Sequence, residues 1–284
     1  MTALTQHNIS RSTKLLFIGL SGSGKTGALA SLASAGYNLR ILDLDNGIDV
    51  LKSLLTDTKS TYDKAAADRV KVKTLTEKMR LFGGKIVPAN ATVWTKIVDI
   101  LSAWTEDDGT KLGSIMDWTE QDILVVDTLT TLSNAAFNQV MALNGKLGQT
   151  VSGYERQRMV WGAQDLIESF LQMICCDAIK CNVIVNSHIK YVEDKEAPKP
   201  TSDDVERIKI GFPSAIGSAL PPKVSTYFNN ILIARQQGDQ RFIQTKTLGT
   251  ALTKSQMPFS VRASYPIATG LADYFKEIRG DAKL

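Results

Sequence analysis

Short apolar runs followed by small or polar residues recur along the chain and predict its buried strands. Residues 15–18 read Leu-Leu-Phe-Ile, residues 123–126 read Ile-Leu-Val-Val, and residues 182–186 read Asn-Val-Ile-Val-Asn. Residues 39–42 begin a further strand of the same kind. Because these runs are too continuously apolar for strands with one solvated face, they indicate strands covered by helices on both faces.

Helical periodicity separates these runs. Apolar residues recur at helical spacing in residues 93–104, 130–143 and 159–174. Near the C-terminus, residues 224–234 and 241–247 predict the two strands of an antiparallel hairpin. The sequence therefore predicts an α/β fold, with a central and mostly parallel sheet flanked by helices and a C-terminal hairpin.

The 284 residues, 43% hydrophobic and 22% charged, fit one large globular domain. Residues 1–12 read as a flexible polar arm and residues 13–284 as the core, with an insertion at about 56–120. Within it, residues 59–85 hold eight basic and three acidic residues, typical of a solvated helical face and less often of a nucleic-acid contact. The net charge of +4 permits a nucleic-acid partner without requiring one.

Composition also excludes several classes of protein. No apolar run reaches the roughly 18 residues of a membrane span, and the polar N-terminus lacks a signal-peptide core, so we expect a cytoplasmic protein without a membrane partner. Three cysteines without a C-x-x-C pair and two histidines argue against a structural zinc site.

A glycine-rich turn joins the first predicted strand to a helix-forming segment. It fits the pattern G-x-x-x-x-G-K-[ST], which is typical of a phosphate-binding loop. Glycines allow backbone N–H groups to converge on an anion, and the following helix begins with unpaired N–H groups. We expect nucleotide binding by Gly19, Ser21, Gly22, Ser23, Gly24, Lys25, Thr26 and Gly27.

Carboxylates follow two other predicted strands. Asp127 ends the strand at 123–126 in the manner of a Walker B aspartate, and is expected to hold Mg²⁺ beside Thr26. Because threonine follows it where many ring ATPases have glutamate, the catalytic base must come from elsewhere. Asp45 is the preferred base and Asp43 the alternative, although both also suit a solvated turn.

Two further segments carry candidate functional residues. Residues 186–188, which include His188, end a strand and are candidates for sensing the γ-phosphate, although a lone histidine is more often structural. The predicted catalytic residues are therefore Lys25, Asp45, Asp127 and His188. Residues 146–158 and 190–209 are predicted loops that suit single-stranded DNA, and the first suits an ordinary surface loop equally well. The DNA-binding candidates in the first are Lys146, Tyr154, Arg156 and Arg158.

Over residues 14–265, the order of these segments along the chain resembles that in the RecA-type P-loop ATPases. Within that group, the sequence resembles the phage-encoded RecA-core ATPases associated with single-strand annealing (the Sak type). The resemblance rests on the phosphate loop, on residues 42–49, on Asp127-Thr128 and on residues 185–188. It implies a Mg²⁺-dependent ATPase acting on single-stranded DNA in recombination or annealing. The aspartate at position 45, where the family usually has glutamate, leaves the base uncertain.

The resemblance also implies partners. We expect a homo-oligomeric ring or filament, and a single-strand-binding protein is a further candidate partner. Lys246 and Lys254 are candidates to reach the γ-phosphate of a neighbouring subunit. The alternative function is a nucleotide-gated assembly or motor ATPase that does not bind DNA. No arginine-rich lid segment follows the Walker B strand and no N-K-x-D motif occurs, which disfavours a small-molecule kinase and a GTPase.

Overall fold

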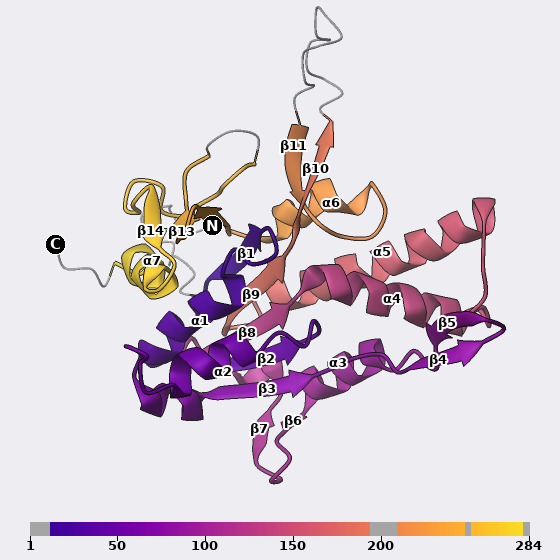
Figure 1. Ribbon diagram of the computed structural model, residues 1–284, viewed down its shortest axis with the longest axis horizontal. Coiled ribbons are helices and arrows are strands. Elements are labelled where there is room, and N and C mark those ends of the chain that lie inside the picture. The colour runs from indigo at the N-terminus through magenta and orange to yellow at the C-terminus, as the bar shows by residue number, and fades with distance from the viewer. Residues whose placement is uncertain (1–11, 194–208, 248–250, 281–284) are drawn as a thin grey trace, which may run out of the picture.

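The computed structural model describes residues 12–193, 209–247 and 251–280. It has an eight-stranded central sheet in the order β14-β13-β12-β1-β9-β8-β2-β3, with helices on both faces (Figure 1). The six strands from β12 to β3 pair in parallel, and β13 and β14 continue the sheet in antiparallel fashion. The strands are β1 (Lys14–Gly19), β2 (Asn38–Asp43), β3 (Val70–Thr74), β8 (Asp122–Asp127), β9 (Asn182–Ser187), β12 (Asn230–Gln237), β13 (Gln240–Gln244) and β14 (Ser264–Pro266). The predicted RecA-like α/β architecture, with its C-terminal hairpin, is confirmed.

Two hydrophobic cores lie on opposite faces of this sheet. Strand β1 contributes Leu16 and Ile18 to one core and Leu15 and Phe17 to the other, since successive side chains of a strand alternate between faces. The first core packs against α3 (Val93–Ser102), α4 (Leu129–Leu143), α5 (Gly153–Cys175) and α6 (Leu220–Val224), and the second against α1 (Lys25–Ser34), α2 (Asp49–Thr56) and α7 (Gly270–Ile278). Strands buried on both faces explain the continuous apolar runs of the sequence.

Three small hairpins and three short 3₁₀ turns complete the described chain. The β10–β11 hairpin projects from one end of the sheet, and the β4–β5 hairpin lies near the α4–α5 connection (Figure 1). The hairpin strands are β4 (Met79–Phe82) with β5 (Lys85–Pro88), β6 (Trp104–Thr105) with β7 (Lys111–Gly113), and β10 (Ile189–Glu193) with β11 (Lys209–Pro213). The 3₁₀ turns are Lys64–Arg69, Ile115–Asp117 and Ser225–Tyr227.

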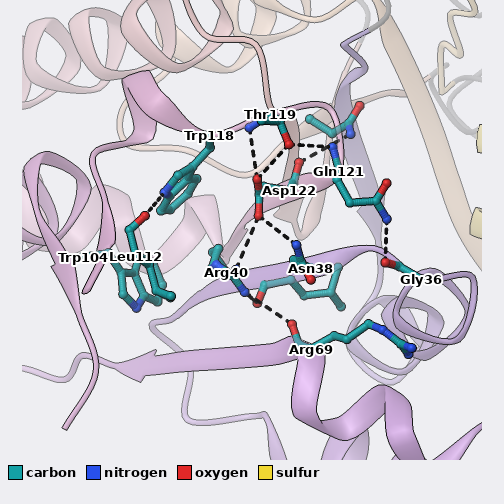
Figure 2. Close-up of polar contacts among 12 residues, drawn as sticks. Gly36, Asn38, Arg40, Arg69, Trp104, Leu112, Trp118, Thr119, Gln121 and Asp122 are labelled. Carbon is teal, nitrogen blue, oxygen red and sulfur yellow. Dashed lines mark hydrogen bonds and ion pairs between the residues drawn. The ribbon is translucent and has the colours of Figure 1, made fainter. Parts of the chain in front are cut away.

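A polar network fixes β2 against β8 at the end of the sheet where both strands begin (Figure 2). The Asp122 carboxylate accepts hydrogen bonds from Asn38 at 3.2 Å and from the Thr119 backbone at 3.0 Å, and pairs with Arg40 at 3.4 Å. Burial lowers the pKa of Arg40, an effect that the Asp122 charge opposes. In this register the same two strands end with their last residues, both aspartates, side by side.

The helices expected at 93–104 and 130–143 match α3 and α4 within two residues, although Trp104 belongs to β6 instead, and the start expected for α5 is wrong. Helix α5 begins at Gly153, so most of the loop expected at 146–158 is helical. Its first two turns are largely exposed and lack apolar periodicity. The basic run at 59–85 is also not one helical face, because it includes β3 and β4. The expected arm at 1–12 lies outside the described residues except for Ser12, and so does most of the second expected DNA loop.

Candidate nucleotide site

The phosphate loop connects β1 to α1 at the carboxyl edge of the parallel strands. Gly22 and Gly24 have φ values of 76° and 94°, which side chains other than glycine rarely adopt. A Cβ on Gly19 would lie 2.6 Å from the carbonyl oxygen of Ala234, so the neighbouring strand β12 also requires glycine there. Helix α1 then begins at Lys25 with Gly24 as its N-cap residue, which leaves backbone N–H groups directed out of its first turn.

Lys25 is held within this loop. Its Nζ donates hydrogen bonds to the carbonyl oxygens of Gly19 and Leu20, each at 3.0 Å. Burial lowers the pKa of this amine, while the carboxylates of Asp127 and Asp45 favour its charged form. Because its two hydrogen-bond partners are neutral carbonyls, this charged amine can donate to an anion that enters the loop.

Thr26 and Asp127 form the second part of the site. The Thr26 hydroxyl donates to Asp127 Oδ2 at 2.7 Å, although 101 residues separate them in the chain. Burial raises the pKa of Asp127, the hydrogen bond from Thr26 opposes that shift, and the nearby charge of Asp45 adds to it. A hydroxyl and a carboxylate at this distance are oxygen ligands of the kind that Mg²⁺ prefers, so both residues fit the metal role expected of them.

Asp45 lies beyond Asp127, on the segment after β2. Its carboxylate accepts hydrogen bonds from the hydroxyls of Thr128, at 3.1 Å, and of Thr131. The Nε2 atom of His188 lies 3.8 Å from Asp45 Oδ2, so the structure brings these two predicted catalytic residues together. The carboxylate remains 30% exposed and can therefore reach a water molecule in the cleft.

Asp43, the alternative base, is buried, and its hydrogen bonds stabilise the local backbone instead. Asp43 is only 1% exposed, and both of its carboxylate oxygens accept hydrogen bonds. Oδ1 accepts from the backbone N–H of Gly47 at 3.1 Å, and Oδ2 accepts from the Thr74 hydroxyl at 3.2 Å. These contacts tie the turn after β2 to the end of β3.

Asn186 lies beside Asp127 in the register between β8 and β9. Its side chain is fully buried, and it favours the charged form of Asp127. Neither of its amide atoms has a hydrogen-bond partner of normal geometry among the described residues. Because buried polar groups are nearly always paired, this amide is available to a water or ligand at the strand end.

A cavity of about 950 Å³ lies beside the phosphate loop, Asp127 and Asp45, and neither Asp43 nor Asn186 is among its lining residues. Six of the predicted nucleotide-binding residues line it, whereas Gly19 and Ser23 line a neighbouring hollow instead. The predicted catalytic residues all line it, together with Thr128 and Thr131. The remaining lining is mostly apolar and consists of Leu44, Gly47, Val50, Leu54, Tyr62, Ile267, Ala268 and Arg241.

Arg241 was not expected in the site. It lies on β13, and its Nε donates to the carbonyl oxygen of Gly22 at 2.9 Å, across 219 residues of sequence. Tyr62 was also missed, and its hydroxyl donates to the carbonyl oxygen of Ala268 at 2.7 Å. Neither residue belongs to a sequence motif. The strand order of the sheet places Arg241 near the loop, and the contact with Ala268 places Tyr62 there.

The two lysines proposed to act on a neighbouring subunit do not line this cavity. Lys254 Nζ donates to the carbonyl oxygen of Phe228 at 2.8 Å within its own chain. Lys246 is exposed.

Three DNA-binding candidates lie at the start of α5, away from α1, and the fourth, Lys146, lies in the connection that precedes it (Figure 1). Two of them already have partners, because Lys146 pairs with Glu155 at 3.2 Å and Arg156 lies 5.7 Å from the ring centre of Phe137. Tyr154 is 72% exposed, and Arg158 is also exposed. His188 and the candidates on α5 therefore occupy separate regions of the molecule.

The chain is similar to a known protein family and to two solved structures. Residues 11–256 match the family model of the AAA domain. Among solved structures, the RadB recombinase is similar with a TM-score of 0.43 and 13% identity, over 91% of this chain and 89% of that one. An ATPase from the type III secretion system of pathogenic bacteria is similar with a TM-score of 0.39 and 13% identity, over 79% of this chain and 52% of that one. No curated protein matches the sequence.

The family match covers most of the chain and includes the phosphate loop, the Walker B strand β8 and the strand β9 that lies between β8 and β1. In the described residues, no helix has both the length and the apolar character needed to cross a membrane. The chain therefore belongs to the AAA domain family.

Proposed function

We propose that this protein is a Mg²⁺-dependent ATP hydrolase. The observation that carries the proposal is the contact between Thr26 and Asp127 at 2.7 Å, next to the buried Lys25 and facing Asp45 across one cavity. Binding of phosphate oxygens and of a metal requires a cation, a hydroxyl and a carboxylate to converge in this way. When bound, Mg²⁺ would neutralise charge on the β- and γ-phosphates.

The residues have separate roles in this proposal. Lys25 transfers its hydrogen bonds from the loop carbonyls to phosphate oxygens, and Thr26 and Asp127 hold the metal. Asp45 takes a proton from the attacking water, with the hydroxyls of Thr128 and Thr131 orienting its carboxylate. His188, which lies 3.8 Å from Asp45, positions that carboxylate further and senses the γ-phosphate.

The apolar part of the cavity suits the base of the nucleotide. Gly27 is close enough to Leu54 that a Cβ on the glycine would lie 3.2 Å from the leucine side chain. Val50, Tyr62 and Ile267 continue this lining. A planar, mostly apolar purine fits such a surface, whereas the phosphates need the polar loop.

We further propose that hydrolysis serves single-stranded DNA in homologous recombination or strand annealing, as in the phage-type ATPases that the sequence resembles. Exposed basic and aromatic side chains at the start of α5 support a DNA partner. Assembly into a ring or filament would bring a second copy to the cavity, and Lys246 is the better of the two candidates to act there, because Lys254 is already bound to Phe228. A single-strand-binding protein remains a candidate partner.

One observation favours the alternative, a nucleotide-gated assembly ATPase without a DNA partner. Met79, Leu81 and Ile86 on the β4–β5 hairpin are 55%, 81% and 70% exposed, which is typical of a protein-contact surface. The experiment that separates the two functions is ATP turnover with and without a single-stranded oligonucleotide, in parallel with oligonucleotide binding at low salt. Stimulation and binding support the DNA function, whereas ATP-dependent assembly without either supports the alternative.

A further inference from the structure

The β4–β5 hairpin and the start of α5 form one continuous surface, although about 60 residues separate them in the sequence. Lys85 Nζ donates to the Thr150 hydroxyl at 3.0 Å. A Cβ on Gly148 would lie 3.2 Å from the side chain of Val87, so the α4–α5 connection packs directly on β5. Figure 1 shows the hairpin beside the loop that leads into α5, at the end of the molecule away from α1.

The hairpin has two chemically different faces. The register pairs Arg80 with Val87 and Phe82 with Lys85, and these four side chains share the face that packs toward the α4–α5 connection. Val87 is buried there, whereas Phe82 is 63% exposed with the Arg80 guanidinium 5.2 Å from its ring centre. The opposite face carries Met79, Leu81 and Ile86 and has no charged residue.

Helix α5 contributes a stripe of alternating aromatic and basic character. Tyr154, Arg158 and Trp161 lie at positions i, i+4 and i+7, which places them on one face of the helix. All three are exposed, and the rings of Tyr154 and Trp161 are 6.2 Å apart at an interplanar angle of 83°. Large aromatic side chains exposed around a guanidinium are uncommon on a surface that only contacts water.

The charge of this surface is positive. Residues 77–88 and 144–161 together hold six basic and two acidic residues. Glu155 pairs with Lys146, and the Glu77 carboxylate accepts hydrogen bonds from the backbone N–H groups of Thr92 and Val93, so the net charge of the two segments stays positive. Arg158 is therefore an exposed cation on the same helix face as Tyr154 and Trp161, and Arg80 is a second exposed cation, beside Phe82.

We propose that this composite surface binds single-stranded DNA, with bases stacking on Phe82, Tyr154 and Trp161 and phosphates pairing with Arg80 and Arg158. The proposal rests on the proposed DNA function and extends it to the β4–β5 hairpin. Single-stranded DNA is favoured over a protein partner on this face because exposed rings lie near Arg80 and Arg158, neither of which has an acidic partner among the described residues. Such a surface matches bases and phosphates at once. Stacking is tolerant of sequence, so we expect binding with little base preference.

The test is fluorescence-anisotropy binding of a labelled oligothymidine to the full-length protein, over a series of salt concentrations. Phe82→Ala and Tyr154→Ala should each weaken binding by about five- to a hundredfold. Phe82→Tyr and Tyr154→Phe keep the ring and should bind like the wild type. Arg158→Ala should also reduce the salt slope by about 0.7.

Controls on other surfaces make the result specific. Leu81→Ala alters the opposite face of the same hairpin, Phe259→Ala removes an exposed ring elsewhere, and Lys276→Ala removes a remote cation. All three should bind DNA normally, and thermal unfolding should show that every variant is folded.

The outcomes are distinct. Wild-type binding that Phe82→Ala and Tyr154→Ala leave unchanged would overturn the composite surface and leave the DNA function in place. A loss of binding in Leu81→Ala equal to that in Phe82→Ala would also overturn it, because the hairpin would then act through contact with another protein copy. Absence of binding by the wild type at low salt would refute both this inference and the DNA function.

Discussion

The assignment of Asp45 as the catalytic base makes a quantitative prediction for Asp45→Asn. The asparagine is nearly isosteric and its side-chain oxygen can still accept a hydrogen bond from Thr128 or Thr131, but it cannot take a proton from water. Loss of a positioned base typically lowers the rate by about 10²–10⁴-fold, which corresponds to roughly 2.7–5.4 kcal/mol of transition-state stabilisation. We therefore expect kcat for ATP to fall by that factor.

Binding and stability should change much less. Asp45 is not placed to contact ground-state phosphates, so the affinity for ATP should stay within about threefold of wild type, or roughly 0.6 kcal/mol. One hydroxyl loses its acceptor, which costs about 1 kcal/mol of unfolding free energy.

Asp43→Asn is the matched control, because it makes the same chemical change at the buried neighbour. Both oxygens of Asp43 accept hydrogen bonds that hold Gly47 and Thr74, so this variant should lose about 1–3 kcal/mol of unfolding free energy. Steady-state phosphate release, ATP titration and denaturant unfolding measure the three quantities for both proteins. Normal turnover in Asp45→Asn, together with greatly reduced turnover in a folded Asp43→Asn protein, would refute the assignment.

Three further predictions concern the rest of the cavity. Lys25→Ala should abolish hydrolysis and weaken ATP binding, measured by phosphate release and calorimetry, and wild-type turnover in this variant would remove the phosphate-loop assignment. Arg241→Ala should weaken ATP binding by about 1.5–3 kcal/mol, the usual contribution of a charge-assisted hydrogen bond, and unchanged affinity in calorimetry would exclude a contact with nucleotide. Burial raises the pKa of Asp127 in the folded chain, so its charged form costs stability at neutral pH, and that cost is relieved as the pH falls through the raised pKa. Nucleotide-free wild type should therefore gain unfolding free energy relative to Asp127→Asn on acidification, and a constant difference across the acidic range would contradict the pKa shift.

The sequence predicted the parts of the fold that local physics determines. Glycine spacing and an adjacent apolar strand defined the phosphate loop, and apolar runs defined β8 and β9, because each of these features lies within a few consecutive residues. The start of α5 was missed because Tyr154 and Arg158 face solvent there and give no apolar periodicity. Strand β3 was missed because its alternating Val and Lys residues were taken as part of a basic helical face.

The residues of the candidate site also fall into two groups: those that sequence motifs predict and those that only the folded chain brings together. Lys25, Thr26 and Asp127 belong to motifs, and the structure brings them together as expected. Arg241 could not be found from sequence, because its contact with Gly22 depends on the order of β13, β12 and β1 in the sheet. The different burial of Asp43, which ends β2, and Asp45, two residues later, was likewise not evident from the sequence.

The measurement that tests the central claim most directly is steady-state phosphate release from ATP by the full-length protein, with Mg²⁺ and with EDTA, in parallel with Lys25→Ala. Adding a single-stranded oligonucleotide to each reaction tests the coupling to DNA. We predict turnover that requires Mg²⁺, rises with the oligonucleotide and is absent in Lys25→Ala. Phosphate release by the wild type that equals that of Lys25→Ala under every condition would contradict the assignment of this protein as an ATP hydrolase.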